Sequence, residues 1–442
     1  MKKAIAVASI LVIGIIAAIP FASGLIMEKT VRQAVEAMNA MNASSGADYS
    51  LKIIHYDRGY RTSDIIWKIN LGSLRAICPI EEIIFRDHAE HGITGVVSTT
   101  SLNNNPWYAY FVADNLLGRD PVRITTHFGF GGGIESTLDL DAFMIPVGDD
   151  TIDVKAGRIV TQTDRALKTF ISSGTWAGLS AGDNLSIGAL SLDSNLTRFS
   201  TFIWDGTASF ALEDLQARMA IDHLHIESVE GGYSIGNTDN RTMVSAEARL
   251  SIDGLRSNKR NVDSASVHID MNGLEADGYA SFLRLYTQNM TQLLGNLQPP
   301  DEGPLVTQAA MSNKGPAPNL RFLAACENLL KAGLELNISN LHVELDDGII
   351  EGGAALRLLQ DVSLMQFPLF INQPGLLLDM LNLESLFKLP SQWVDANPRL
   401  TIPLYPGMQT GLFVQQGDDL IHQAKTVDGR LMLNGKEVFL AK

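Results

Sequence analysis

The feature that most constrains this fold is a period-two alternation of apolar and polar side chains. It recurs in residues 65–71, 244–252 and 265–271. Because successive side chains of a strand point to opposite faces, this period predicts half-buried strands. The candidate apolar surface consists of six positions: Ile65, Trp67, Ile69, Val267, Ile269 and Met271. We expect a mainly β protein with several helices (α+β), built on a large, extended antiparallel sheet whose apolar face lines either an open groove or a closed core.

Short Asx-Gly pairs predict where the strands reverse direction. Three of them lie beside alternating runs: Asp253-Gly254, Asn272-Gly273 and Asn434-Gly435. Type I′ hairpin turns need positive φ at both central residues, and Gly, Asn and Asp adopt it more readily than other residues. We expect tight hairpins at all three pairs, and the C-terminal one, within RLMLNGKEVFL, is the clearest.

The N-terminus carries two lysines followed by a long uncharged run. Lys2 and Lys3 precede residues 4–27, which would extend about 36 Å as a helix. That length spans a bilayer core, and the positive-inside rule keeps the lysines in the cytoplasm. We expect a single transmembrane helix in the bacterial inner membrane, with most of the chain in the periplasm. A signal peptide cleaved near Ala22 is the alternative.

Helical periodicity appears in residues 28–42, 279–297, 319–334 and 376–387, and the first of these segments carries a Val/Met stripe that we expect to pack on the protein's own sheet. The five prolines and two glycines of residues 298–318 disfavour regular structure. The predicted organisation is a cytoplasmic stub and transmembrane anchor (1–27), an amphipathic helix (28–45), a β-rich periplasmic body (46–297), a Pro/Gly-rich linker or loop (298–318), and a helix with a C-terminal β region (319–442).

The charge of the chain argues against nucleic acid as a partner. The formal net charge is −15 and the pI is near 5.0, whereas phosphate backbones attract Lys and Arg. The two cysteines, Cys78 and Cys326, either pair as a disulfide or remain separate buried thiols, and their spacing leaves both readings open.

The segment YDRGYRTS, residues 56–63, resembles the YdgA-like family of uncharacterised bacterial envelope proteins. Members of that family have an N-terminal anchor, a strand, a Tyr-x-Arg-Gly-aromatic turn with a nearby serine, and a second strand. The resemblance continues in order through His91-Gly92, residues 116–121, 176–179 and 428–436. Ile93 stands where the family has proline, so the turn at this point is not carried over. The resemblance implies an anchored envelope protein and supplies no reaction.

Five residues of this segment form a candidate site: Tyr56, Arg58, Gly59, Tyr60 and Ser63. We expect a structural corner between two strands, because glycine permits positive φ and the polar side chains can bridge neighbouring backbone. The alternative is a binding site in which the planar guanidinium of Arg58 recognises a carboxylate or phosphate.

Four motifs suggest catalysis or ligand binding without forming a convincing active site. The GLSAG motif around Ser180 matches a nucleophile elbow, but the residues after it predict a strand where the elbow needs a helix. The DHAEH motif offers metal ligands, yet a strand directs His88 and His91 to opposite faces. The glycines of residues 129–133 suit a hairpin tip, and the histidines of residues 222–225 suit cross-strand pairing.

We therefore expect no catalytic residues, no metal and no cofactor. The leading hypothesis is a non-enzymatic, inner-membrane-anchored envelope factor that offers an apolar sheet surface to a lipid or to a membrane-protein partner. The alternatives are a structural or interaction protein that acts as a homo-oligomer, such as a homodimer, and an envelope hydrolase.

Overall fold

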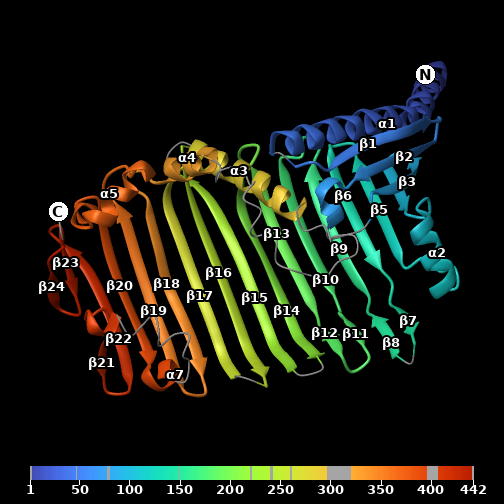
Figure 1. The fold of residues 1–442 in the computed structure, drawn as a ribbon. Coiled ribbons are helices and arrows are strands. Elements are labelled where there is room, and N and C mark those ends of the chain that lie inside the picture. Colours follow the sequence, from blue (N-terminus) through green and yellow to red (C-terminus); the bar gives the residue numbers. More distant parts are fainter. Residues whose placement is uncertain are drawn as a thin grey trace. The chain divides into compact units, whose positions relative to one another are not determined.

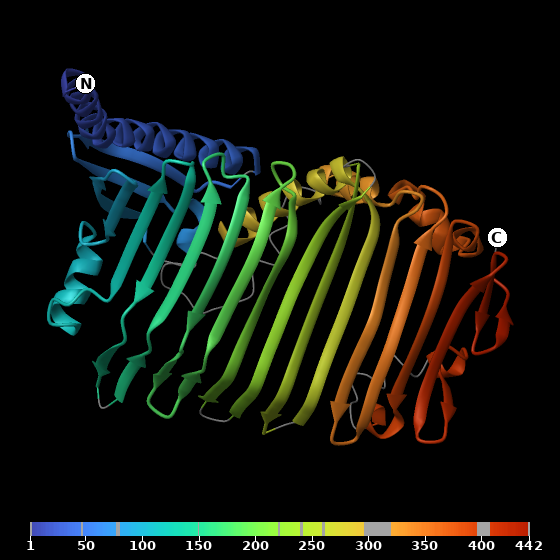
Figure 2. The same ribbon diagram turned by 180° about the vertical axis from the view of Figure 1, so that it is seen from behind.

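The structure is a computed structural model that describes residues 2–45, 47–76, 80–148, 150–219, 222–238, 242–258, 261–295, 320–395 and 407–440. The chain divides into two compact units, each containing antiparallel strands. Unit 1 comprises Met1–Gly182, Ser191–Trp204 and Arg284–Gly315; unit 2 comprises Asp183–Leu190, Asp205–Leu283 and Pro316–Lys442. Figures 1 and 2 show their elements from opposite sides.

Unit 1 combines one long helix with a meander of strands. Its elements are α1 (Lys2–Ser45), β1 (Ser50–Arg58), β2 (Thr62–Asn70), η1 (Gly72–Ala76), β3 (Glu82–His91), β4 (Gly95–Ser101), α2 (Pro106–Asn115), β5 (Val122–Gly129), β6 (Gly133–Leu140), β7 (Phe143–Val147), β8 (Asp150–Val154), β9 (Gly157–Asp164), β10 (Thr169–Trp176), β11 (Leu179–Ala181) and β13 (Leu190–Arg198). The main sheet runs β1-β2-β3-β4-β5-β6-β9-β10. Helix α1 lies over one face of it and contacts β1, β3 and β4 (Figure 1).

Unit 2 is built mainly on longer strands. Its elements are β12 (Leu185–Ile187), β14 (Trp204–Met219), β15 (Asp222–Thr238), β16 (Met243–Ser257), β17 (Asn261–Glu275), the part of α3 (Ala276–Gly295) up to Leu283, α4 (Leu320–Leu329), β18 (Glu335–Leu345), β19 (Gly348–Leu358), η3 (Leu364–Gln366), α5 (Phe367–Asn372), α6 (Gly375–Leu378), β20 (Leu381–Pro390), α7 (Ser391–Asp395), β21 (Val414–Gln416), β22 (Asp419–Val427), β23 (Arg430–Leu433) and β24 (Lys436–Val438). Strands β14 to β20 pair antiparallel in chain order, and β20 continues through β22 and β23 to β24.

The alternating runs are confirmed as strands, and one of the three predicted hairpins is confirmed. Runs 65–71, 244–252 and 265–271 lie in β2, β16 and β17, and Asn434-Gly435 joins β23 to β24 with φ of 48° and 77°. The other two predictions are wrong, because Gly254 and Gly273 lie inside long strands with φ of 61° and 74°. The register between β16 and β17 skips a residue beside Gly273, so positive φ there accommodates a bulge and not a reversal.

The predicted transmembrane anchor is wrong. Residues 4–42 belong to the single helix α1, and among the described residues no helix is both long enough and apolar enough to cross a membrane. One side of the second half of the apolar run packs on the protein itself, since Ser23 is 3% exposed and Met27 is 1% exposed, whereas Phe21, Leu25 and Ile26 are exposed. Met27, which sequence alone assigns to lipid, is therefore part of the core of unit 1.

Two predicted helices are confirmed and a third is mostly wrong. Of the predicted ranges 279–297 and 319–334, residues 279–295 lie in α3 and residues 320–329 form α4, which ends five residues before Leu334. Residues 376–387 contain only the short α6 before β20 begins. The leucine-rich residues 376–387 fit the helical period and also the strand period, because Leu381, Leu383 and Phe387 alternate with polar residues. Residues 381–388 form a strand because they pair with β19. Residues 298–318 lie outside the described residues.

The core of unit 1 lies between α1 and the first strands. Met27, Ile65, Ala89 and Val96 are almost completely buried together, and Phe128 is partly buried against them. Burying a side chain of the Met or Ile class stabilises a fold by about 1.5–3 kcal/mol. This contact therefore accounts for the position of α1 on its sheet.

Candidate functional site

One face of the unit 2 sheet is apolar across seven consecutive strands, from β14 to β20. Residues paired directly across strands form three continuous rows: Phe210-Gly231-Leu250-Val267-Leu341-Gly352-Phe387, Ala208-Tyr233-Ala248-Ile269-Ile338-Ala354-Ser385, and Gly206-Ile235-Ala246-Met271-Leu336-Leu356-Leu383. A fourth row of six residues adjoins the first: Leu212-Val229-Ile252-Ala265-Val343-Ile350. We call these four rows the apolar face.

The opposite side of the same strands is polar. One of its rows reads Thr207-Ser234-Glu247-Asp270-Asn337, and another contains Glu230-Ser251-Ser266-His342-Glu351-Lys388. A sheet with one polar and one apolar side ordinarily buries the apolar side against another layer. We would therefore expect another layer to cover the apolar face of unit 2.

The apolar face is only partly covered. Phe210, Tyr233, Leu250 and Leu336 are 37–43% exposed. Among the described residues, Val244 and Leu274 are almost completely buried toward the end of the strands where α4 contacts β17 (Figures 1 and 2), and Ile350 of the fourth row is also buried. With strands about 4.8 Å apart and about 3.4 Å per residue, the four rows cover roughly 30 Å by 20 Å. That is the size of the largest apolar patches on monomeric proteins, which are often functional.

Two phenylalanines lie flat at opposite sides of the apolar face. A Cβ added to Gly231 would meet Phe210 Cε1 at 2.4 Å, and one added to Gly352 would meet Phe387 Cδ1 at 2.3 Å. Each ring therefore occupies the space that a side chain on the neighbouring strand would take. The small residues between them, such as Ala248 and Ala354, keep the middle of the face shallow.

The structure separates the six predicted apolar positions. Val267, Ile269 and Met271 are half-buried on the apolar face of unit 2. Ile65 is fully buried under α1 in unit 1, and Trp67 packs beside it, stacked on Phe85 with 4.2 Å between ring centroids.

Ile69 follows these two residues along β2 and is half-buried. Trp67 donates a hydrogen bond from Nε1 to Asp87 at 3.0 Å, and burial raises the pKa of Asp87 above its ordinary value. These β2 positions belong to a helix-covered core.

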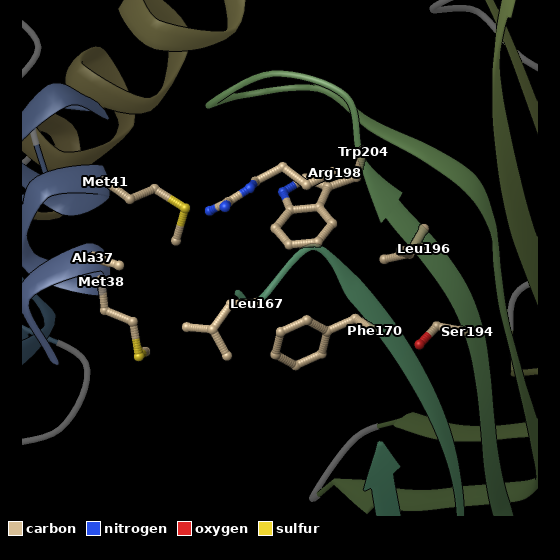
Figure 3. A pocket seen from close by; sticks show the side chains of 9 residues that line it. All are labelled: Ala37, Met38, Met41, Leu167, Phe170, Ser194, Leu196, Arg198 and Trp204. Carbon is tan, nitrogen blue, oxygen red and sulfur yellow. The ribbon is translucent and has the colours of Figure 1, made fainter. Parts of the chain in front are cut away.

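Unit 1 contains a partly open cavity of about 290 Å³ between α1 and the strands (Figure 3). It is lined by Ala37, Met38, Met41, Leu167, Phe170, Ser194, Leu196, Arg198 and Trp204. The Met stripe predicted to pack on the sheet thus lines a cavity in its C-terminal part. The ring of Trp204 meets Phe170 edge to face, with centroids 5.7 Å apart.

Leu167 reaches this cavity from an unusual backbone conformation. Its φ of 52° lies in the left-handed region, where a non-glycine residue costs roughly 1–2 kcal/mol. Asp164 holds the turn by accepting hydrogen bonds from the backbone N–H groups of Leu167 and Lys168. The turn thereby directs an apolar side chain into the cavity where glycine or asparagine would be less strained.

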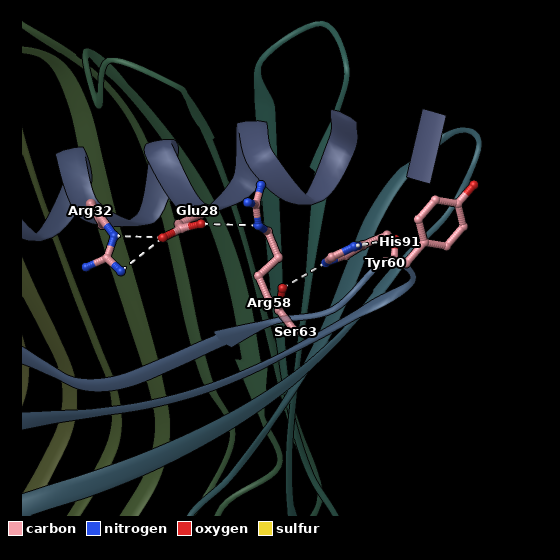
Figure 4. Close-up of polar contacts among 6 residues, drawn as sticks. All are labelled: Glu28, Arg32, Arg58, Tyr60, Ser63 and His91. Atoms are coloured by element: carbon pink, nitrogen blue, oxygen red, sulfur yellow. Dashed lines mark hydrogen bonds and ion pairs between the residues drawn. The ribbon is translucent and has the colours of Figure 1, made fainter. Parts of the chain in front are cut away.

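The predicted corner joins α1 to the first hairpin (Figure 4). Arg58 Nε lies 3.4 Å from Glu28 Oε2, and its guanidinium lies 5.0 Å from the centre of the Phe21 ring. Arg32 also pairs with Glu28, at 3.0 Å, and lies over the Tyr56 ring. Arg58 therefore engages residues of α1.

The turn of this corner is closed by a hydrogen bond from the Gly59 N–H to Thr62 O at 2.8 Å. Gly59 does not adopt positive φ. A Cβ at Gly59 would lie 3.2 Å from that same oxygen. Tyr56 is partly buried, and burial raises its pKa to about 12. Tyr60 is 51% exposed. The geometry is that of a structural corner that fastens α1 to the sheet.

A buried histidine completes this attachment. His91 lies 2.9 Å from Ser63 Oγ through Nε2 and 3.4 Å from Tyr60 O through Nδ1. Because a carbonyl only accepts, Nδ1 carries the proton and Ser63 donates to Nε2. Burial lowers the pKa of His91 below its ordinary value of 6.5. A Cβ on Gly24 of α1 would lie 2.2 Å from the ring, so only glycine permits this approach.

The catalytic motifs do not assemble into a site. Ser180 lies in the short strand β11 and is followed by β12, where a nucleophile elbow needs a helix. His88 is exposed and pairs with Asp64 at 3.2 Å, while His91 is buried on the other face of β3. His225 pairs across strands with Asp214 at 3.1 Å.

Two other sequence features have simple structural outcomes. Residues 129–133 connect β5 to β6 as a hairpin turn. Cys326 is a free thiol, and Cys78 lies outside the described residues.

Sequence reasoning did not identify a cluster on the polar side of unit 2. His268 Nε2 lies 3.0 Å from Glu247 Oε1 and 3.3 Å from Asp270 Oδ1. Ser234 and Ser339 donate hydrogen bonds to the remaining oxygens of the two carboxylates. The i, i+2 spacing of His268 and Asp270 signals a shared face, but only the register with β16 adds Glu247. These groups could chelate a divalent cation, although half-exposed acidic groups also gather in this way without one.

A family model described as "Bacterial protein of unknown function (DUF945)" matches residues 1–441. Comparison with curated proteins found no match, and comparison with solved structures found none either. Because the match covers essentially the whole sequence, the chain belongs to this bacterial family of unknown function, DUF945.

Proposed function

We propose that this protein is a non-enzymatic binding protein for lipids, and that acyl chains lie on the apolar face of unit 2. The observation that carries the proposal is the exposure of Phe210, Tyr233, Leu250 and Leu336 on the apolar face of a sheet whose other side is polar. Leaving such a surface in water is unfavourable by about 25 cal/mol for each Å² of apolar area. A ligand that covers it is favoured by the same effect.

The chemistry of the apolar face favours hydrocarbon over a protein partner. Protein interfaces carry about one hydrogen bond per 100–200 Å². On this face the side-chain polar groups are the hydroxyls of Tyr233 and Ser385, and Ser385 is already bonded to His422 at 2.9 Å. The backbone groups of the seven strands are paired within the sheet. Acyl chains need no hydrogen bonds.

The dimensions also suit an acyl chain. One leaflet of a bilayer core is about 15 Å thick, and the four rows extend roughly 20 Å along the strands. The shallow middle formed by Ala248 and Ala354 leaves room for chains between Phe210 and Phe387. A second copy of the chain, covering the same face as a homodimer, is the competing occupant.

We propose further that the protein acts in the bacterial envelope and is YdgA-like, on the basis of the ordered motifs that begin with residues 56–63. Fractionation of cells expressing the full chain would test the location. Recovery with the cytoplasmic fraction alone would count against it.

The binding proposal is tested by charge placement on one strand. Ala248→Asp introduces a carboxylate in the middle of the apolar face, and Ser251→Asp introduces the same carboxylate on the polar side of β16. We expect mass spectrometry of the detergent-free wild type to show bound phospholipid, Ala248→Asp to lose about tenfold or more of it, and Ser251→Asp to retain it.

Circular dichroism establishes that both variants fold, and sedimentation gives the oligomeric state. Equal lipid content in both variants would contradict the proposal, as would a lipid-free wild type. A dimer that dissociates on Ala248→Asp would favour the second copy as the occupant.

A further inference from the structure

We infer that the unit 1 cavity is a separate site for a single-chain amphiphile with an anionic head group, a carboxylate or a phosphate. This inference goes beyond the apolar face and does not depend on it, because all nine lining residues belong to unit 1. It concerns one bound molecule of defined polarity, whereas the apolar face is a broad surface without charge.

The body of the cavity suits a hydrocarbon chain. Its volume is about 290 Å³ and it is partly open, so a chain longer than the cavity can extend out of it. Met38 and Met41 line one side, and thioether side chains adapt to flexible apolar partners. Leu196 and Phe170 line the other side.

Arg198 and the indole nitrogen of Trp204 lie at one end of the cavity, and the Ser194 hydroxyl lies beside Phe170, away from Arg198 (Figure 3). Figure 3 shows the Arg198 guanidinium between Met41 and Trp204, with the indole nitrogen on the ring edge nearest Arg198. Arg198 Nη2 donates one hydrogen bond, to Ala166 O at 3.1 Å. Within the described residues no carboxylate pairs with Arg198, although fifteen ion pairs of other Lys or Arg side chains are formed there.

This arrangement matches the two ends of an anionic amphiphile. A guanidinium carries five N–H donors in a planar fork, and most of those of Arg198 remain available. Carboxylates and phosphates accept two parallel hydrogen bonds from such a fork. The strained turn at Leu167 strengthens the assignment, because it directs an additional apolar side chain into the same space.

Binding of matched twelve-carbon probes tests the inference. Dodecanoate and dodecyl phosphate carry the anionic head, dodecanol lacks the charge, and inorganic phosphate lacks the chain. We expect the full-length protein to bind both anions at least tenfold more tightly than dodecanol, by calorimetry below the critical micelle concentration. Inorganic phosphate alone should not compete.

Variants assign the binding to the cavity. Arg198→Gln should weaken binding of both anions about tenfold and change the affinity for dodecanol by less than about twofold. Ala37→Phe should weaken binding of both anions and of dodecanol, because the ring would fill the cavity. The control Arg158→Gln removes a guanidinium that pairs with Asp139 elsewhere in unit 1, and should change nothing. Ala248→Asp in unit 2 should also leave this binding intact.

Three outcomes would overturn the inference: equal affinity for dodecanol and dodecanoate, competition by inorganic phosphate alone, or no effect of Ala37→Phe. If Arg198→Gln fails to fold, Arg198→Lys provides the second test. It should retain anion binding because it keeps the charge, and complete loss of binding in folded Arg198→Lys would contradict a charge-directed site.

Discussion

The two units treat the apolar sides of their sheets differently. In unit 1, α1 covers the first strands and buries Ile65 and Met27 almost completely. In unit 2, Leu250 and Tyr233 remain more than two-fifths exposed in the middle of a continuous apolar surface. The same alternating pattern therefore produces a closed core around Ile65 in one place and an open apolar surface in the other.

The difference in burial between the two units follows from the contacts that hold a helix on the sheet. Unit 1 is closed by specific contacts, including the pairing of Arg58 with Glu28 and the fit of His91 against Gly24. On the described part of unit 2, the helix α4 contacts β17 near one end of the strands, and the rows through Ile269 remain partly exposed. A covering helix needs its own attachment residues, and sequence alternation alone does not provide them.

The largest expected difference between the units is in stability. Met27→Ala empties a buried position in unit 1 and should lower the free energy of unfolding by about 2–5 kcal/mol. Leu250→Ala removes a side chain that is 41% exposed and should cost about 1 kcal/mol. Urea unfolding followed by circular dichroism measures both. Equal losses would mean that Leu250 is as fully covered as Met27, and would contradict an open apolar face in unit 2.

A smaller effect is expected where α1 touches His91. Gly24→Ala places a methyl group in the imidazole ring, which must move, so we expect a loss of about 1–3 kcal/mol. Gly131→Ala is the matched control, because a Cβ there meets nothing within 4 Å. A neutral Gly24→Ala in the same urea titration would show that α1 does not depend on this contact.

The burial of His91 against α1 predicts that stability depends on pH. Burial lowers the pKa of His91 in the folded state, so the unfolded chain binds more protons below pH 6.5. The stabilising contribution is complete above pH 6.5 and is lost as pH falls toward the lowered folded value. Unfolding free energies measured between pH 5 and pH 8 should therefore rise with pH.

His91→Gln should reduce that slope, and His88→Gln is the control because His88 is exposed on the opposite face of β3. An unchanged slope in His91→Gln would assign the pH dependence to other groups.

The smallest effect concerns the edge of the apolar face. Gly352→Ala displaces the Phe387 ring, whose Cδ1 would lie 2.3 Å from the new methyl group, and because the ring lies on a partly open face the loss should stay within about 1 kcal/mol. The displaced ring should instead increase binding of an environment-sensitive apolar dye. A loss of several kcal/mol would mean that Phe387 is locked in a core.

Sequence periodicity predicts the strands well and the covering layer poorly. The runs through Trp67 and Ile269 are both strands, as their alternation indicates, yet nothing local distinguishes the covered one from the open one. Burial depends on a partner segment distant in sequence. For β2, that partner is the apolar run of residues 4–27, whose length and composition alone favour a membrane.

The candidate sites show the same limit. The corner of residues 56–63 is recognisable from its glycine, arginine and tyrosines, but its contacts with Glu28 and Phe21 require the folded position of α1. The cavity residues Met41, Arg198 and Trp204 come from three separate elements. Their spacing in sequence contains no signal that would bring them together.

Site-specific photo-crosslinking distinguishes a lipid-binding apolar face from one that is covered by protein. A photoreactive residue at Ile269 faces the apolar side of β17, and the same residue at Ser266 faces the polar side of the same strand. After irradiation in cells, we predict lipid adducts by mass spectrometry at position 269 and none at position 266. Equal lipid labelling at both positions, or exclusive crosslinking of position 269 to protein, would contradict an open lipid-binding face.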